Sequence, residues 1–153
     1  MSGPESASIT FRPAVIADLP AVAEFLKSCG LPAQDLTPEI LAGFELAFSA
    51  EGRLVGQVGL EAFGDIGLLR SLAVVPELRE LGLGEQLVMR GEAAARRAGL
   101  SAVYLLTTTA AEYFRCRTYA DVPRENVPTA IAAHAQFRSL CPSSAQCLVR
   151  RLP

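Results

Sequence analysis

The sequence predicts a mixed α/β (α+β) fold, with a central sheet of six or seven strands that is antiparallel in its N-terminal part. Three observations support this. Residues 68–75 form an apolar run that Pro76 ends, because proline has no N–H for a strand ladder. Leu83–Arg97 carries apolar side chains at helical spacing, and Ala102–Thr107 is a second short apolar run. A strand, a helix and a strand in this order predict a right-handed crossover between parallel strands.

The elements before this crossover begin with a strand and a helix. Residues 8–12 alternate apolar and polar side chains, which indicates a strand. Asp18 stands where a helix over Leu19–Ser28 would have its N-cap, and Gly30 follows as its stop.

A short helix and two strands complete the N-terminal half. Thr37, Pro38 and Glu39 supply an N-cap, a first-turn proline and an early acid for a helix that ends near Gly43. Strands follow over residues 44–49 and 54–63. The turns between these runs are short, so we expect three antiparallel strands linked by hairpins.

The C-terminal part adds shorter elements after Gly99, which we expect to stop the central helix. In chain order these are a helix over residues 110–116, a strand over 119–122, a partly helical segment over 127–140 and a strand over 145–151. We expect a single domain over residues 1–153, with residues 1–7 flexible.

The composition is that of a globular protein and excludes several functional classes. Hydrophobic residues make up 50% of the chain and charged residues 20%, with a net charge of −2. No basic block is present, so we expect no nucleic-acid partner. No apolar run is long enough to span a bilayer, and the N-terminus lacks the regions of a signal peptide. We therefore expect a cytoplasmic protein with no membrane partner.

The cysteines do not have the spacing of a metal site. They stand at positions 29, 116, 141 and 147, without a Cys-x-x-Cys pair, and His134 is the single histidine. We therefore expect no metal, and reduced thiols that pack in the core.

The junction between Pro76 and the central helix has features of an anion site. The first N–H groups of a helix have no partner within the helix, and the helix dipole adds partial positive charge there. Gly82 and Gly84 allow close approach to the backbone, and Arg79 adds a full charge. These features suit a phosphate or pyrophosphate. The alternative is a turn whose glycines serve packing only.

Arg70 is a charged residue within the apolar strand over residues 68–75. A buried charge is costly unless it is paired. One interpretation is an ion pair with Glu45 or Glu61. The other is that Arg70 holds an anionic substrate, because a guanidinium binds a carboxylate bidentately.

The segment from Leu72 to Pro76, followed by Arg79, Gly82 and Gly84, resembles the cofactor motif of the GNAT superfamily of acyl-CoA N-acyltransferases. That motif is arginine or glutamine, two residues, glycine, one residue, then glycine or alanine. The predicted order of elements resembles the GNAT fold over nearly the whole chain. This resemblance implies acetyl transfer from acetyl-CoA to a primary amine of a small molecule.

The resemblance also implies roles for particular residues. The strand before the central helix and the strand after it would splay into a wedge that receives the pantetheine arm. The main chain of Leu72, Ala73 and Val74 would contact the acetyl group and this arm. The residues that would wrap the pyrophosphate are Arg79, Glu80, Leu81, Gly82, Leu83, Gly84, Glu85 and Gln86.

The chain departs from the family after the second parallel strand. Phe114 stands where many members have the tyrosine that protonates the departing thiolate, so we expect it to pack beside the arm instead. The remaining candidates for this acid are Tyr113, Ser71, Thr108 or a water. Thr118 replaces a usual glycine, so we expect the turn there to differ.

A narrower resemblance lies near the C-terminus. Residues 136–145, followed by Cys147 and Leu148, are similar to a subgroup of arsenic-resistance N-acetyltransferases, and the chain is also similar to short glutamate N-acetyltransferases. Both imply an anionic amino acid as acceptor, either glutamate or an arsenic- or phosphorus-containing analogue. Such an acceptor suits Arg70, Arg124 or Arg138. Cys141 and Cys147 could bind arsenic, but core packing is the better interpretation.

The prediction is therefore an acetyl-CoA-dependent N-acetyltransferase that acts on the amine of a small anionic amino acid. The alternative is an acyl-CoA-binding module without catalysis, which Phe114 motivates. An acetyltransferase that modifies proteins or antibiotics is a third interpretation. Residues 131–140 and the last strand would be the contact surface of a homodimer.

Overall fold

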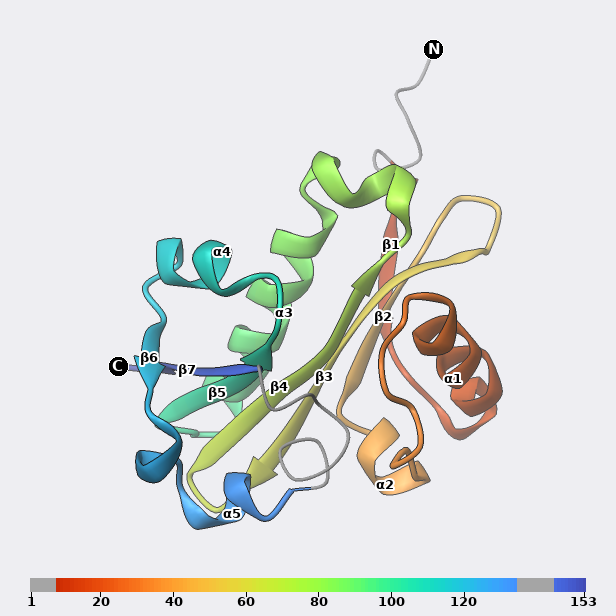
Figure 1. Ribbon diagram of the computed structural model, residues 1–153. Helices are drawn as coiled ribbons and strands as arrows, with labels where there is room; N and C mark the ends of the chain where they lie inside the picture. The colour runs from red at the N-terminus through yellow and green to blue at the C-terminus, as the bar shows by residue number, and fades with distance from the viewer. Residues whose placement is uncertain (1–7, 135–144) are drawn as a thin grey trace. The chain divides into compact units, whose positions relative to one another are not determined.

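The computed structural model describes residues 8–134 and 145–153 (Figure 1). The strands are β1 (Thr10–Pro13), β2 (Phe44–Phe48), β3 (Leu54–Phe63), β4 (Ile66–Val74), β5 (Ala102–Thr107), β6 (Ala120–Val122) and β7 (Gln146–Arg151). They form one seven-stranded sheet in the order β1-β2-β3-β4-β5-β7-β6. The pair β4–β5 is parallel, whereas β1–β2, β2–β3, β5–β7 and β6–β7 are antiparallel. The mixed sheet predicted from the sequence is confirmed.

The α-helices agree with the sequence patterns, whereas the three 3₁₀ turns were not predicted. They are α1 (Leu19–Ser28), α2 (Pro38–Leu41), α3 (Leu83–Arg97), α4 (Ala111–Cys116) and α5 (Thr129–Ala132), with 3₁₀ turns at Ile16–Asp18, Pro76–Leu81 and Arg124–Asn126. The sequence did not predict the turn at Pro76–Leu81, which leads from β4 toward α3. Because this turn contains Arg79, it bears directly on the candidate anion site.

The described residues form two compact units. The first consists of residues 8–60 and 71–93, and the second of residues 61–70, 94–134 and 145–153. Three elements, β3, β4 and α3, contribute residues to both units. The single domain over residues 1–153 stays a prediction.

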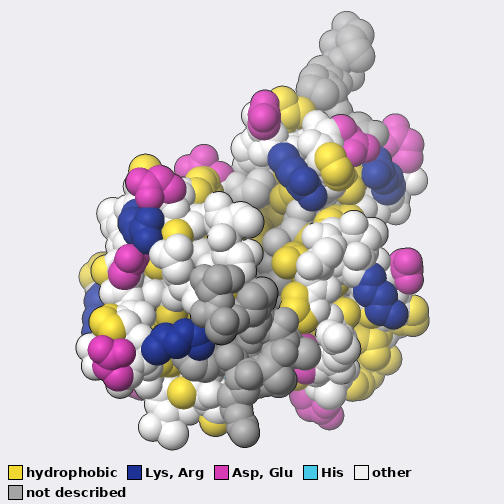
Figure 2. All heavy atoms as spheres, viewed as in Figure 1, with side chains coloured by type: hydrophobic (Ala, Val, Ile, Leu, Met, Phe, Trp, Pro, Cys, Tyr) yellow, Lys and Arg dark blue, Asp and Glu magenta, His cyan; other side chains and the backbone are white. Residues whose placement is uncertain are grey.

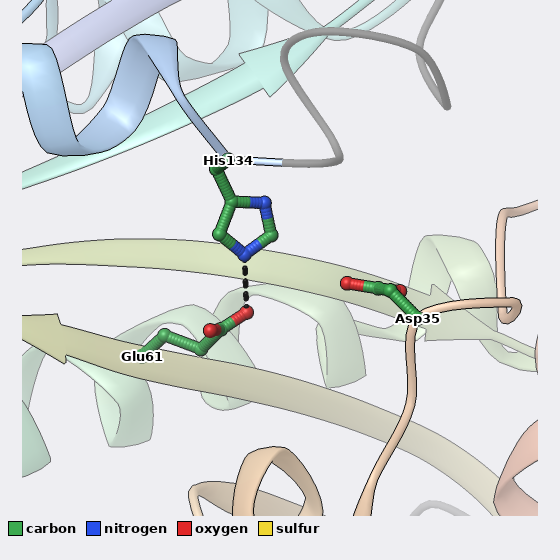
Figure 3. Close-up of side chains that lie close together, drawn as sticks. All are labelled: Asp35, Glu61 and His134. Atoms are coloured by element: carbon green, nitrogen blue, oxygen red, sulfur yellow. Dashed lines mark hydrogen bonds and ion pairs between the residues drawn. The ribbon is translucent and has the colours of Figure 1, made fainter.

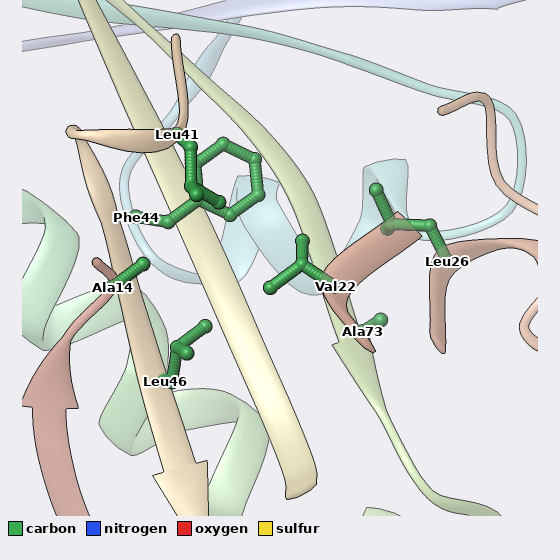
Figure 4. Close-up of a cluster of buried hydrophobic side chains, with 7 residues drawn as sticks. All are labelled: Ala14, Val22, Leu26, Leu41, Phe44, Leu46 and Ala73. Atoms are coloured by element: carbon green, nitrogen blue, oxygen red, sulfur yellow. The ribbon is translucent and has the colours of Figure 1, made fainter. Parts of the chain in front are cut away.

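The core of the first unit lies where α1 and α2 cover β2. Val22 and Leu26 of α1 are fully buried, and Leu41 of α2 packs in the same cluster with Phe44 and Leu46 of β2 (Figure 4). Burying side chains of this size stabilises a fold by about 1.5–3 kcal/mol each. This cluster therefore holds the two helices on the sheet.

The end of α1 and the start of α2 agree with the sequence prediction, whereas the start of α1 does not. Gly30 ends α1 with φ of +75°, as predicted, and the Thr37 hydroxyl accepts the N–H of Ile40 at the start of α2. Asp18 does not cap α1 with its side chain. Its carboxylate instead accepts the N–H of Val15 and the guanidinium of Arg12, so it braces the 3₁₀ turn before the helix.

The helix α3 approaches β3 closely in the first unit. A Cβ added at Gly56 would lie 2.9 Å from Leu87 Cδ1 and 3.2 Å from Leu83 Cδ2. Both leucines are buried. The absence of a side chain at position 56 is therefore what lets the N-terminal part of α3 rest on the strand.

The core of the second unit gathers β4, β5, β7 and α5. It contains Leu68, Ala102, Tyr104, Ile131 and Cys147. Ile131 is fully buried there, so it is not available for the homodimer surface that we predicted from the sequence. Residues 135–140 of that segment lie outside the described residues.

The exposed charges are mixed in sign. On the face shown in Figure 2, the Lys and Arg side chains lie apart from one another, and several neighbour Asp or Glu side chains. Within the described residues, no helix is long and apolar enough to cross a membrane. A cytoplasmic location stays a prediction.

Gln57 of β3 is an unusual residue in the first unit. It is fully buried, and neither Nε2 nor Oε1 has a hydrogen-bond partner among the described residues. A buried amide without partners costs about 1–3 kcal/mol. The variant Gln57→Leu is therefore expected to raise the free energy of unfolding in urea by about this amount, whereas Gln57→Glu lowers it. A leucine variant that is less stable than the wild type would contradict this reading.

Candidate functional site

The chain leaves β4 through an anchored turn in the first unit. The N–H of Val75 donates to the carbonyl of Val55 at 2.9 Å, and Leu78 of the 3₁₀ turn is buried. Gly82 then takes φ of +88°, a conformation that glycine adopts without steric cost. We refer to residues 76–86 as the glycine loop. The protein's own contacts therefore hold the backbone of this loop in place.

The start of α3 presents backbone donors. The N–H of Gln86 donates to the carbonyl of Gly82 at 3.1 Å. The amides of Leu83 and Gly84 precede this bond and have no partner within the helix. A Cβ at Gly84 would meet only Val74 Cγ2, at 3.9 Å, so the backbone there is open to a ligand. A helix of 15 residues also directs its dipole at this point, so the start of α3 suits an anion.

Arg79 lies in the same loop and is exposed. Its Nε donates to the carbonyl of Val74 at 2.9 Å. A guanidinium has five N–H donors, so this bond orients the group and leaves Nη1 and Nη2 for another acceptor. No acceptor for these two atoms is recorded among the described residues. Arg79 and the amides of α3 therefore belong to one cationic surface of the first unit.

The strand β4 has an irregular backbone next to this loop. Its parallel register with β5 runs from Ile66↔Ala102 to Leu68↔Tyr104, and no further pair follows among the described residues. Ser71 takes φ of +60°, which costs a residue with a side chain about 1–2 kcal/mol. The backbone of Leu72, Ala73 and Val74 therefore directly follows an irregular residue within β4.

A buried charged cluster lies in the second unit. Glu61 Oε2 is 2.7 Å from Arg70 Nη1. The same oxygen is 2.8 Å from His134 Nε2 (Figure 3). The side chains of Arg70, Glu61 and His134 are 1%, 13% and 8% exposed. We refer to these three residues as the Glu61 cluster. Of the ion pairs predicted for Arg70, the one with Glu61 is confirmed, whereas Glu45 pairs with Arg90 in the first unit.

The cluster keeps Glu61 ionised. Burial raises the pKa of this carboxyl, but hydrogen bonds from His134 and Arg70 and their positive charge lower it by more. The net effect is a pKa below the usual value for a glutamate. A permanent carboxylate in this position can fix the orientation of both of its partners.

The residues that follow β5 form the second group in this unit. Thr107 Oγ1 accepts the N–H of Ala110 at 2.9 Å and so caps the start of α4, and Thr108 is exposed. Tyr113 is 40% exposed, and its ring meets Phe114 edge to face at 5.1 Å. Phe114 is buried and meets Tyr119 in the same way. Of the acid candidates here, the Thr108 and Tyr113 side chains reach solvent.

The backbone turn at Thr118 differs less from a glycine turn than the sequence suggested. It takes φ of +73°, the left-handed conformation that a glycine adopts after a helix. The N–H of Tyr119 donates to the carbonyl of Phe114 at 3.0 Å and closes this turn. The backbone turn that we expected to differ is therefore of the glycine type, although a β-branched residue occupies it.

Of the three described cysteines, Cys29 and Cys147 pack in the hydrophobic clusters, whereas Cys116 is exposed, so the predicted core packing is wrong for Cys116. Cys147 is buried in the core of the second unit, and burial raises its pKa to about 11, with a smaller opposing effect from Arg124. A thiol with this pKa stays protonated at neutral pH and is a poor ligand. Cys116 is exposed, and Cys141 lies outside the described residues.

The predicted site residues thus fall into two groups. The second unit contains Arg70, Thr108, Tyr113 and Phe114. The first unit contains the strand and loop residues, which are Ser71, Leu72, Ala73, Val74, Arg79, Glu80, Leu81, Gly82, Leu83, Gly84, Glu85 and Gln86. Arg124 donates to the carbonyl of Ala145, and Arg138 lies outside the described residues.

The pairing of Glu61 with His134 was not predicted from the sequence. The available signal was the single histidine, which we used only to argue against zinc. The two residues are 73 positions apart, and no local pattern connects them.

Comparisons with known proteins add a family and a fold. Residues 21–121 match the model described as the Acetyltransferase (GNAT) family. An amino-acid acetyltransferase of Pseudomonas putida is 40% identical over 85 residues, which are 54% of this chain and 20% of that protein. One from Ectopseudomonas mendocina is 42% identical over 72 residues, or 47% of this chain and 17% of that protein. The chain thus spans about a fifth of the length of these curated relatives.

Solved structures show the same fold. N-acetylglutamate synthase from Neisseria gonorrhoeae, complexed with coenzyme A and N-acetyl-glutamate, has a TM-score of 0.82 at 24% identity, covering 95% of this chain and 35% of that chain. Its complex with coenzyme A and L-arginine has a TM-score of 0.78 at 26% identity, covering 95% and 33%. The protein Rv2747 from Mycobacterium tuberculosis, in complex with CoA, has a TM-score of 0.78 at 22% identity, covering 94% and 99%.

Proposed function

Because this chain belongs to the Acetyltransferase (GNAT) family, we propose that it is an acetyl-CoA-dependent N-acetyltransferase whose acceptor is a small anionic amino acid. The relatives that it matches are amino-acid acetyltransferases, and similar structures are complexes with coenzyme A. The single observation that carries the acceptor class is the buried Arg70 of the Glu61 cluster.

The glycine loop fits the diphosphate of coenzyme A. The left-handed Gly82, the open backbone at Gly84 and the exposed Arg79 supply donors and positive charge without a side chain in the way. The positive φ at Ser71 suits an incoming pantetheine arm, because it changes the direction of the backbone directly before Leu72, Ala73 and Val74. The same main chain can stabilise the oxyanion that forms at the thioester.

The acceptor would bind through Arg70. A guanidinium that already holds one carboxylate in a buried site can hold a second one, and it does so in a fixed orientation. This selects acceptors with an anionic group near the amine. Glutamate and its arsenic- or phosphorus-containing analogues are the members of this class that we propose to test first.

The departing thiolate needs a proton. Phe114 has no hydroxyl and is buried, so it packs beside the arm in this proposal. Thr108, Tyr113 and Ser71 remain the side chains proposed for the acid, with Tyr113 favoured because its side chain is exposed and its phenol is the strongest acid of the three.

A thiol-release assay tests this function. Purified protein with acetyl-CoA is expected to release thiol with glutamate or with an arsenic- or phosphorus-containing analogue, and to be much slower with matched amines that lack the anionic groups. Calorimetry with acetyl-CoA runs in parallel. If acetyl-CoA binds but no amine in the panel leads to thiol release, the acyl-CoA-binding module is favoured over the enzyme. If acetyl-CoA gives no binding heat, both hypotheses are wrong.

A further inference from the structure

Gln57 of β3 carries a buried amide for which the fold supplies no partner. Its side chain is fully buried, so bulk water does not reach it, and neither Nε2 nor Oε1 is hydrogen-bonded among the described residues. Polar groups in protein interiors are nearly always paired, and an amide left unpaired lowers the stability of the fold. Such a residue indicates a partner that arrives with a ligand.

The amide lies on the face of the sheet that α1 covers. In the register of β2 with β3, Gln57 is directly opposite Leu46, and opposite residues of an antiparallel pair project to the same face. Leu46 is fully buried in the cluster that also contains Val22, Leu26 and Ala73 (Figure 4). These neighbours are apolar. A hydrogen bond that a ligand makes to the amide here is therefore electrostatically stronger than the same bond in water.

The next strand of the sheet brings Ala73 beside Gln57. A two-residue turn joins β3 to β4, and the two strands are neighbours in the sheet, so they run antiparallel. The N–H of Val75 donates to the carbonyl of Val55 at 2.9 Å. Two residues from that bond along each strand, Ala73 is opposite Gln57. A Cβ added at Gly56 would lie 3.4 Å from the carbonyl oxygen of Ala73, which agrees with this pairing.

The residues of β4 near Gln57 face two different parts of the first unit. The side chain of Val74 faces the start of α3, because its Cγ2 would be 3.9 Å from a Cβ at Gly84. Ala73 projects to the opposite face, into the cluster with α1. In the proposed function, the diphosphate binds at the start of α3 and the acetyl group lies against the main chain of residues 72–74. Gln57 is thus a polar side chain on the adjacent strand, level with the acetyl group.

The length of the Gln57 side chain fits this position. Adjacent strands lie about 4.8 Å apart, and an extended glutamine carries its amide about this far from its own Cα. Ala73 has only a methyl group as its side chain, so it offers little steric obstacle to an amide that extends from β3 to the level of β4.

We propose that Gln57 Nε2 donates a hydrogen bond to the carbonyl oxygen of the acetyl thioester and stabilises the oxyanion that forms there. This inference rests on the proposed function, and it adds a side-chain donor to the main-chain donors of β4. Gln57 is a catalytic residue in this proposal, because its N–H contacts the reacting group.

Gln57 keeps its protons throughout the reaction. The lone pair of the neutral amine forms the C–N bond, and the π electrons of the carbonyl move to the oxygen. That electron pair then returns, the C–S bond breaks and the thiolate leaves. One proton of the amine nitrogen passes to the sulfur, giving the N-acetyl product and free thiol. The N–H of Gln57 contributes most while the oxygen is negative, because hydrogen bonds to ions are the stronger ones.

The test uses Gln57→Met in the full chain. Methionine has an unbranched side chain of similar length but no N–H donor. Calorimetry compares acetyl-CoA with coenzyme A, which lacks the acetyl carbonyl. The Kd of acetyl-CoA is expected to rise about 2- to 10-fold, and that of coenzyme A to stay within about twofold of the wild type. With the best amine found for the wild type, kcat is expected to fall by about 10²–10³-fold.

Urea denaturation supplies a readout that separates this role from a structural one. The free energy of unfolding of Gln57→Met is expected to rise, because the unpaired amide is gone, so stability and activity change in opposite directions. Gln57→Leu, with a shorter and branched side chain, is measured beside it and is expected to show the same pattern.

Three outcomes would overturn the proposal. One is a wild-type kcat with a wild-type ratio of the two Kd values in both variants, which would leave the proposed function intact. Another is a loss of stability in both variants, because the amide would then have a partner within the fold. The third is a wild type that binds neither acetyl-CoA nor coenzyme A, which would overturn the proposed function and this inference together.

Discussion

Arg70→Met is expected to lower the free energy of unfolding by about 3–5 kcal/mol and to abolish turnover of anionic amino acids. Arg70 is 1% exposed, and its partner Glu61 is 13% exposed. Removing the guanidinium leaves the Glu61 carboxylate in the protein interior without its 2.7 Å ion pair to Arg70. Urea denaturation measures the first effect, and the thiol-release assay measures the second.

Two further variants separate stability from function. Adding Glu61→Gln to Arg70→Met removes the uncompensated charge, so most of the lost stability is expected to return while turnover does not. Arg70→Lys keeps the charge but not the planar donor fork, so it is expected to raise the KM for the amino acid more than it lowers stability. A double variant that regained turnover would show that Arg70 serves the fold alone.

The ion pair between Arg70 and Glu61 also predicts how the free energy of unfolding changes with pH. The pKa of Glu61 is lower in the folded protein than in the unfolded chain, where it has its ordinary value of about 4.3. The contribution of the pair is therefore complete above this value and is lost as the pH falls through the folded pKa. In Arg70→Met, Glu61 has lost the guanidinium that lowers its pKa, so it takes up a proton at a higher pH than in the wild type. The difference in stability between the two should therefore shrink as the pH falls from there through the folded pKa of the wild type. A difference that stayed constant would mean that Glu61 is not the partner that matters.

Much of the fold could be predicted because local patterns carry it. The ranges Leu83–Arg97, Ala102–Thr107 and Leu54–Phe63 agree with the elements observed. In each case the period of the apolar side chains and a flanking breaker, Gly64 or Gly99, mark the element without help from distant contacts. The glycine loop could be located in the same way, since its function depends on backbone groups and consecutive residues.

The Glu61 cluster could be predicted only in part, because long-range pairing decides it. The sequence showed that Arg70 needs an acid, but Glu45 and Glu61 were equally acceptable until the strand register was known. His134 joins Glu61 across 73 positions. The conformation of Ser71 could not be predicted either, because its positive φ occurs within a strand and no side-chain pattern indicates it.

Charge reversal at Arg79 is expected to weaken acetyl-CoA binding by at least about 100-fold, or about 3 kcal/mol, in calorimetry. Nη1 and Nη2 are the atoms proposed to bind the diphosphate, and each charge-assisted bond contributes about 1.5–3 kcal/mol. Arg79→Glu removes these bonds and places a negative charge beside the anion. The fold should lose no more than about 1 kcal/mol, because the only bond recorded for Arg79 among the described residues is the one from Nε to Val74.

Arg97→Glu is the matched control for this change. It makes the same change in net charge at an exposed arginine in the last turn of α3, while Arg79 precedes the first turn. Reversal at the C-terminus of a helix costs stability of about 0.3–1 kcal/mol through the dipole, but it leaves the amides of Leu83 and Gly84 unchanged. Equal loss of acetyl-CoA affinity in both variants would mean that net charge, and not the glycine loop, governs binding. Loss confined to Arg79→Glu is expected because a guanidinium binds a diphosphate at hydrogen-bond distance, and salt screens the interaction over about 10 Å.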